Sequence, residues 1–200
     1  MTSQNGDPTK NSHFHGPENA EHELRKAYNC VVETGVNHFW DRRGLQGVNP
    51  DEVVTLYKHA FNSFRRGNRL AAERWARTVK HLSRAFWHEA KIAYLEPRAA
   101  ELPFLEGAER EEYGLRDHSD TAADLLNSVV EHIPPGLTQR PKEMDRYLVR
   151  ARRHLKMLEQ PDYHHELLRA ERIMAAHEYG RVLECMALAY ESELAGKKVA

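Results

Sequence analysis

Apolar residues that return every three or four positions are the feature that most restricts how this chain of 200 residues folds. Steps of 4, 3, 4, 4 and 3 place one run of such residues on a single face of an α-helix: Trp75, Val79, Leu82, Phe86, Ala90 and Ala93. No stretch shows the apolar–polar alternation of a half-buried strand. The composition agrees, because the chain has 22 Ala and 20 Leu but only three Ile. The sequence therefore predicts an all-α protein.

Capping residues predict where the two central helices begin and end. Asn49-Pro50 predicts the start of a helix that runs to Arg66 and stops at Gly67-Asn68. Glu96-Pro97 ends the helix that follows. The residues around the Gly67-Asn68 turn, from Phe64 to Val79, resemble the turn and second helix of a tetratricopeptide repeat over about 20 residues. The pattern does not recur about 34 residues later. We interpret the segment as an ordinary helical hairpin closed by a glycine turn.

The remaining segments complete a single domain at residues 18–200, an antiparallel bundle of about six helices. Further helices are expected at about 18–42, 119–132, 141–158 and 162–194. An irregular connection is expected at 97–118 and a proline-rich loop at 133–141, and residues 1–17 are expected to form a disordered polar arm. The last helix is expected to bury one face: Leu167, Ala170, Ile173, Ala176, Gly180, Leu183, Ala187, Tyr190 and Leu194.

The N-terminal residues and the cysteines indicate a cytoplasmic protein. The first residues lack the basic start and apolar core of a secretory signal, and no stretch approaches the ~18 apolar residues of a membrane span. Cys30 and Cys185 each lie inside an apolar-periodic run and are expected to be buried free thiols. We therefore expect no membrane partner.

Histidine is the unusual component, with 13 residues in a chain of formal net charge −1. A metal site on one helix needs ligands three or four residues apart, and no two histidines have that spacing. No cofactor is predicted, although a metal site assembled from several helices stays open. Its best face is the stripe of His164, Glu171 and Glu178 on the last helix, for which a solvated polar face is the alternative.

One local pattern suggests chemistry. The stretch Arg172-Ile-Met-Ala-Ala-His177-Glu-Tyr179 resembles the R-x4-H-x-Y pattern of HEPN-type ribonucleases, small helical proteins that dimerise to bring two Arg/His pairs together. The resemblance implies metal-independent RNA cleavage, with His177 as acid or base and Arg172 steadying the phosphate. On a continuous helix, however, positions five apart diverge by about 140°. The alternative is a surface Arg172 and a half-buried His177.

Two basic stripes raise the question of an anionic partner: Arg74, Arg77, Arg84 and Lys91 on one helix, and Arg146, Arg150, Arg153 and Lys156 on another. Acidic residues balance them overall, and aromatic residues for base stacking do not alternate with them, so we expect solvated faces with local ion pairs. Four aromatic residues could line a pocket between helices but are expected in the core: Tyr147, Trp87, Tyr94 and Phe104.

Two classes of function follow. The first is a helical interaction or scaffold protein that binds a protein partner or itself, for example as a homodimer through the heptad spacing of Met144–Leu158. The second is an enzyme, either a HEPN-like ribonuclease that uses Arg172, His177 and Tyr179 or a metal enzyme built in the bundle. The sequence favours the first class, because it contains no convergent catalytic motif, and leaves open whether the chain is an enzyme.

Overall fold

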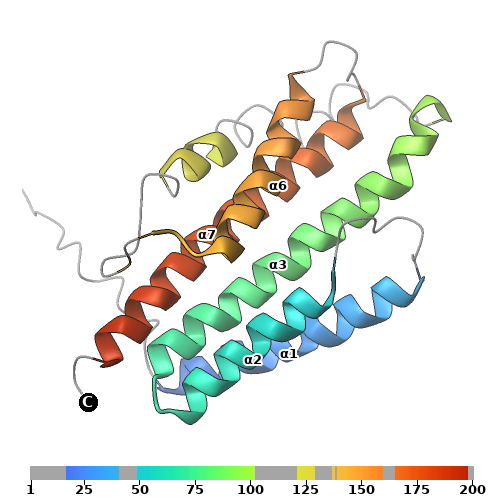
Figure 1. The fold of residues 1–200 in the computed structure, drawn as a ribbon. Coiled ribbons are helices and arrows are strands. Elements are labelled where there is room, and N and C mark those ends of the chain that lie inside the picture. Colours follow the sequence, from blue (N-terminus) through green and yellow to red (C-terminus); the bar gives the residue numbers. More distant parts are fainter. Residues whose placement is uncertain are drawn as a thin grey trace, which may run out of the picture.

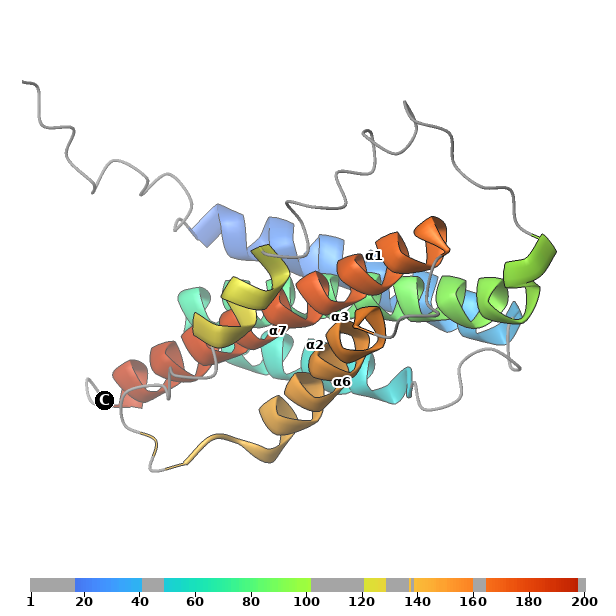
Figure 2. The same ribbon diagram turned by 90° about the horizontal axis from the view of Figure 1, so that it is seen from above.

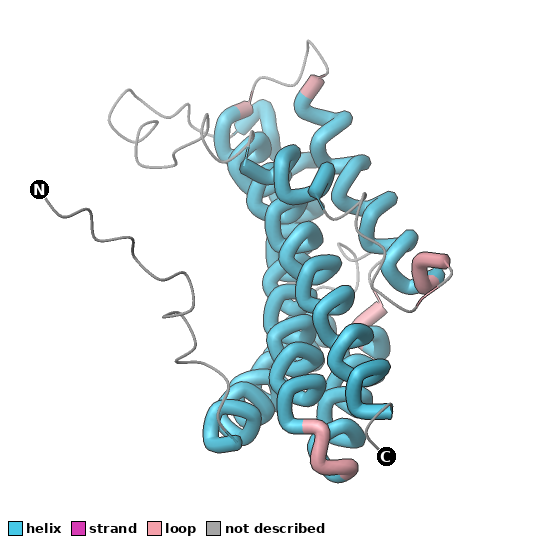
Figure 3. Tube along the Cα trace, turned by 90° about the vertical axis from the view of Figure 1, so that its left-hand side faces the viewer, coloured by secondary structure: helices cyan, strands magenta, loops and turns pink. Residues whose placement is uncertain are grey.

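The computed structural model describes residues 17–40, 49–101, 121–128, 137, 139–159 and 165–197, and every regular element among them is helical. The elements are α1 (Pro17–Trp40), α2 (Asp51–Arg65), α3 (Arg69–Leu95), the 3-10 helix η2 (Glu96–Glu101), a short helix at 121–128, α6 (Lys142–Leu158) and α7 (Glu166–Lys197). Figure 3 shows the described residues as helices with a few short loop segments. The predicted all-α bundle is confirmed.

Helix α3 lies at the centre of the bundle. It packs against α1 and α2 on one side and against α7 on the other, while α6 packs on α7 (Figure 1). Residue pairs across the contacts show that α3 runs antiparallel to α7 and that α7 runs antiparallel to α6. No described helix is both long and apolar enough to cross a lipid bilayer.

The helix ends around α2 and α3 agree with the capping prediction to within a residue. The Asn49 side chain accepts the backbone N–H of Asp51 at 3.0 Å. Between the two helices Gly67 adopts a φ of +80°, a conformation that favours glycine. Asn68 then caps α3 by accepting the N–H of Ala71 at 3.1 Å. The helical hairpin expected from the sequence is therefore present.

The main core contains residues from α1, α2, α3, the helix at 121–128, α6 and α7. Helix α7 buries more than one of its faces. Besides the expected Ile173, Ala176 and Leu183, it buries a second set of residues: Leu168, Ala175, Tyr179, Val182, Met186 and Ala189. Leu167 and Leu194 are only partly buried. The single-face prediction was too narrow, because α3, α6 and the helix at 121–128 surround α7.

The helix at 121–128 contacts α7 at Gly180. A Cβ atom on Gly180 would lie 2.8 Å from Leu125 Cδ2, so the absent side chain is what allows this close approach. Figure 2 shows the short helix, in yellow, beside α7. Leu126 of the same helix belongs to the main core.

The heptad face of α6 packs inside the same chain. Met144, Leu148 and Ala151 are buried members of the main core, and Leu155 packs against it. A second copy would therefore need another surface for the homodimer predicted from these residues.

Some predictions fall outside the described residues. The arm expected at 1–17 is described only at Pro17, where α1 begins, and the connection expected at 97–118 only at 97–101, which belong to η2. Of the proline-rich loop, residues 137 and 139–141 are described.

Two tryptophans on α3 allow a matched test of this packing. Trp75 is 1% exposed, packs edge-on against Tyr190 and donates from Nε1 to Glu193, whereas Trp87 is 48% exposed. Trp75→Ala should lower the free energy of unfolding by about 3–5 kcal/mol, because it opens a cavity and removes a hydrogen bond. Trp87→Ala should change it by less than about 0.5 kcal/mol. Urea denaturation followed by circular dichroism measures both, and equal effects would contradict the assigned core.

Candidate functional site

Two histidine–glutamate pairs join α3 to α7. His81 Nδ1 lies 2.6 Å from Glu178 Oε2, and His88 Nδ1 lies 2.6 Å from Glu171 Oε2. The histidines are seven residues apart on α3 and the glutamates seven apart on α7, which is about two turns on each helix. Because an ionised carboxylate can only accept, each Nδ1 carries the shared proton.

Each pair is joined by an Arg or Lys side chain three residues further along α3. Arg84 Nη1 lies 3.8 Å from the other oxygen of Glu178, and Lys91 Nζ lies 2.8 Å from the other oxygen of Glu171. The interface thus contains the same unit twice: a histidine, an Arg or Lys, and a facing carboxylate.

Burial and the cations act in opposite directions on the pKa values of these carboxylates. Burial alone would raise the pKa of Glu178, but the hydrogen bond and charge of His81, with the charge of Arg84, lower it below its ordinary value. His88 and Lys91 likewise outweigh burial at Glu171 and lower its pKa. Both glutamates are therefore held ionised in the fold.

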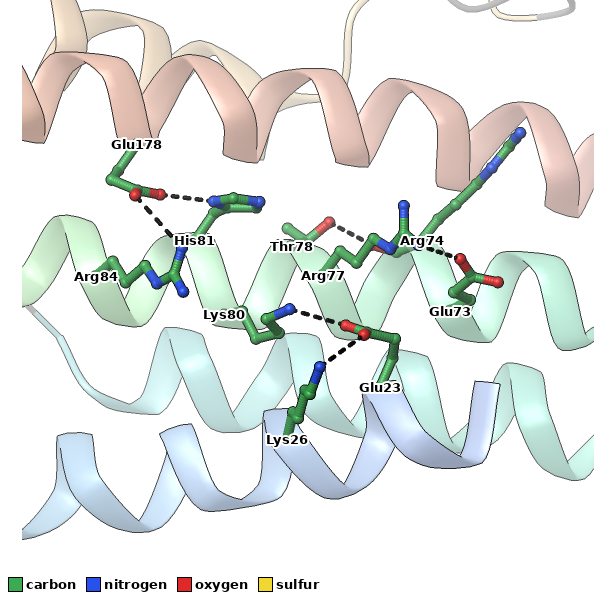
Figure 4. A network of polar contacts seen from close by, with 10 residues as sticks. All are labelled: Glu23, Lys26, Glu73, Arg74, Arg77, Thr78, Lys80, His81, Arg84 and Glu178. Carbon is green, nitrogen blue, oxygen red and sulfur yellow. Dashed lines mark hydrogen bonds and ion pairs between the residues drawn. The ribbon is translucent and has the colours of Figure 1, made fainter. Parts of the chain in front are cut away.

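A different side of α3 bonds to α1 (Figure 4). Glu23 of α1 is buried and accepts from Lys80 at 2.9 Å and from Lys26 at 3.5 Å. Closer to the start of α3, Glu73 pairs with Arg77 at 2.6 Å, and Arg74 reaches α7, where it donates to the Leu188 carbonyl at 2.7 Å. Polar contacts therefore line α3 from its first turns to its C-terminal half.

A second polar cluster lies where α3, α6 and α7 meet. His154 of α6 is buried, with Nε2 3.2 Å from Glu89 Oε1 and Nδ1 3.4 Å from Arg172 Nη1. Arg172 also bonds to Glu96 at the start of η2. A guanidinium only donates, so His154 Nδ1 is the acceptor in its contact with Arg172.

Two tyrosines continue this cluster. The Tyr179 ring stacks between Tyr147 and His154, with both ring centroids 6.1 Å away. Its hydroxyl is buried beside Glu89 and Arg150, and burial with the Glu89 charge raises its pKa well above 10. Arg150 in turn pairs with Glu52 of α2 at 3.3 Å. The Tyr179 hydroxyl therefore keeps its proton inside the core.

The three residues of the ribonuclease-like pattern lie on one unbroken helix. Arg172 and Tyr179 are buried in the second polar cluster, whereas His177 is half-buried. Because α7 continues through residues 172–177, Arg172 and His177 diverge by about 140°. The alternative expectation of a surface Arg172 was wrong, because Glu96 and His154 bind it inside the protein.

The two glutamates of the stripe considered for a metal, Glu171 and Glu178, are bonded to basic side chains of α3. Glu178 is buried and Glu171 largely so, both bonded to α3, so the expected solvated face was wrong. His164 lies outside the described residues. Within the described ranges, no three His, Cys, Asp or Glu residues gather in a way that could hold a metal ion. Neither Cys185, which is buried, nor Cys30, which is half-buried, forms a disulfide, and burial raises the pKa of the Cys185 thiol to about 11.

The basic stripes carry both ion-paired and exposed cations, in line with the expected solvated faces with local ion pairs. On α3, Arg74 and Arg77 form the contacts given above; on α6, Arg146 and Arg150 pair with Glu52, while Arg153 and Lys156 are exposed. The expected core positions of Trp87 and Tyr94 were wrong, because both rings stand exposed on α3 among the cations of its stripe. Of the four aromatic residues expected in a pocket or the core, Tyr147 is in the core and Phe104 lies outside the described residues.

The histidine–glutamate pairs had a signal in the sequence. His81 and His88 share the seven-residue spacing of Glu171 and Glu178. The spacing of three or four residues that marks a metal site on one helix does not reveal these pairs, because the two partners of each pair lie on different helices.

Comparisons with protein-family models, with curated proteins and with solved structures found no match to this chain.

The lowered pKa values predict acid sensitivity with a defined sign. A carboxylate whose pKa in the fold lies below its ordinary 4.5 stabilises the protein above that pH, and this stabilisation is lost as the pH falls through the lower folded value. The double variant Glu171→Gln/Glu178→Gln should be less stable by about 2 kcal/mol at pH 7. It should also lose less stability than the wild type between pH 5 and 3.

Urea denaturation at several pH values measures this difference. Glu143→Gln, at an exposed position on α6, is the matched control and should keep the wild-type pH profile. An unchanged acid slope in the double variant would show that the two pairs do not control acid stability.

Proposed function

We propose that this chain is a helical interaction protein that binds a protein partner or a second copy of itself. The observation that carries the proposal is the division of side chains between the inside and the outside. Histidines and arginines suited to catalysis are bonded to one another in the core, as at His154 and Arg172. Large apolar side chains are exposed on two outer faces: Tyr28, Val32 and Phe61 on α1 and α2, and Trp87 and Tyr94 on α3.

The first outer face is a small aromatic cluster. The Tyr28 and Tyr57 ring centroids lie 5.9 Å apart, and Tyr57 stacks on Phe61 at 6.5 Å. Tyr28 and Phe61 are about half exposed, so contacts among the rings leave apolar surface in water. Exposed aromatic clusters of this kind are typical of protein-binding surfaces.

The ribonuclease hypothesis has less support from the geometry. A phosphate-binding Arg172 would first have to leave Glu96 and His154. Leaving them would remove the donor from a buried imidazole nitrogen, which costs free energy.

A complex that depends on the exposed rings tests the proposal. The full chain is examined by light scattering between 5 and 200 µM, and immobilised chain is used to capture partners from a lysate. The wild type should form a complex of defined stoichiometry. Tyr28→Ser/Phe61→Ser combined with Trp87→Ser/Tyr94→Ser should abolish it while the circular dichroism spectrum stays unchanged. A chain that stays monomeric and captures nothing that the variant fails to capture would overturn the proposal.

Cleavage of a labelled single-stranded RNA separates the two classes. The interaction proposal expects no cleavage above that of His177→Ala. Cleavage that disappears in a folded His177→Ala variant would place the chain among the enzymes instead.

A further inference from the structure

An exposed face of α3 alternates cations with aromatic rings. The residues step by 3, 4, 3 and 4 positions and continue from α3 into η2: Arg84, Trp87, Lys91, Tyr94 and Arg98. At about 100° per residue the four residues on α3 fall within an arc of about 80°, and Arg98 follows them in η2. We call them the cation–aromatic strip. Trp87 is 48% and Tyr94 55% exposed, and the side chains of Arg84 and Lys91 are 59% and 41% exposed.

The strip is separate from the core face of the same helix. Across the same turns α3 buries Ala85, Phe86 and Ile92. The cations of the strip lie near its own rings: Arg98 Cζ is 4.1 Å from the centre of Tyr94, and Lys91 Nζ is 5.8 Å from the centre of Trp87. These cation–π contacts hold the rings at the surface without burying them. Helix α3 therefore carries, besides its core face, an outer face whose two aromatic rings stay about half exposed.

The spacing of the strip fits a helix as its occupant. Trp87 and Tyr94 are seven residues apart, or about 10.5 Å along the axis. A helix packed alongside presents its own apolar residues with the same seven-residue repeat. An extended strand would present same-face side chains about every 6.8 Å, which does not match the distance between the rings.

The charges indicate the sign of that helix. Arg84, Lys91 and Arg98 also repeat every seven residues, beside the rings. Glu178 and Glu171 neutralise the first two from the α7 side, while Arg98 stands over Tyr94 at the exposed end. Carboxylates with a seven-residue repeat on a partner helix would meet all three cations.

We propose that the cation–aromatic strip binds an acidic amphipathic helix of a partner protein. The apolar positions of that helix would pack on Trp87 and Tyr94, and its carboxylates would pair with Arg84, Lys91 and Arg98. This proposal rests on the proposed function and names the surface and the chemistry of the partner. A single-stranded RNA fits less well, because the two rings lie about 10.5 Å apart, which is the seven-residue repeat of a packed helix.

A pair of synthetic peptides tests the proposal. The acidic probe is a labelled 21-residue peptide with Leu at the a and d positions of each heptad and Glu at e and g. These glutamates also oppose pairing of the probe with itself. Its twin carries Lys in place of each Glu. Fluorescence anisotropy with the full chain should give at least about tenfold tighter binding of the acidic probe than of its twin.

Variants of the full chain locate the binding surface. Trp87→Ala/Tyr94→Ala should weaken binding of the acidic probe by at least about tenfold, because aromatic anchors dominate such interfaces. Arg98→Glu should weaken it by several-fold. Val149→Ala, at an exposed apolar residue on α6, and Arg153→Glu, at an exposed cation on the same helix, are the controls and should stay within about twofold of the wild type.

Four results would overturn the proposal. These are no binding of the acidic probe, equal binding of the two peptides, unchanged binding by Trp87→Ala/Tyr94→Ala, or tighter binding of a labelled 20-nucleotide oligouridine that the same variant weakens. If the peptides fail while a complex that depends on Tyr28 and Phe61 persists, the proposed function stands and this inference falls. RNA cleavage lost in His177→Ala would instead remove the proposed function itself.

Discussion

The antiparallel contact between α3 and α7 is the constraint on which the rest of the structure depends. Every other long helix packs on one of these two: α1 and α2 on α3, and α6 on α7. Apolar burial supplies the attraction, but apolar side chains tolerate more than one alignment. The two histidine–glutamate pairs allow fewer alignments of α3 against α7. A shift of one helix by seven residues would pair His88 with Glu178. His81 and Glu171 would then both lose their partners, and Glu171 would remain as an unpaired carboxylate in the interface.

The second polar cluster places α6 in the same way. His154 and Arg172 connect α6 and α7 to the end of α3, while Arg150 connects α6 to Glu52 at the start of α2. These bonds connect α6 with α2, α3 and α7. The side chains in them are fixed by one another, so their proton positions follow from which groups can donate and which can only accept. The polar interior thus acts as a set of alignment contacts between helices.

The fold was largely predictable because its signals are local. Asn49, Gly67 and Pro97 mark helix ends through their own backbone preferences, and the face of Trp75, Val79 and Leu82 follows from helical periodicity. Helix α7 was less predictable, because how many sides of a helix are covered depends on neighbours distant in sequence.

The candidate site was predicted poorly for the same reason. Glu171 and Glu178 stood out as a stripe, but their partners His81 and His88 are about 80 to 100 residues away and become visible only once the register of two helices is known. Arg172 was assigned to a ribonuclease-like pattern or to the surface, whereas Glu96 and His154 bury it. Tyr94 and Trp87 follow a helical period that also fits a core, so only the packing shows that they face outward.

Once the third tryptophan, Trp40, has been replaced, the two indole rings on α3 give the protein two separate optical reporters. Trp75 lies in a dry environment against Tyr190, and its emission reports whether the bundle is intact. Trp87 stands in water twelve positions further along, and its emission responds to whatever approaches the outer surface of the helix. One rigid rod thus carries an internal and an external fluorophore, which lets unfolding and surface occupancy be told apart by their spectra without adding a dye to the protein.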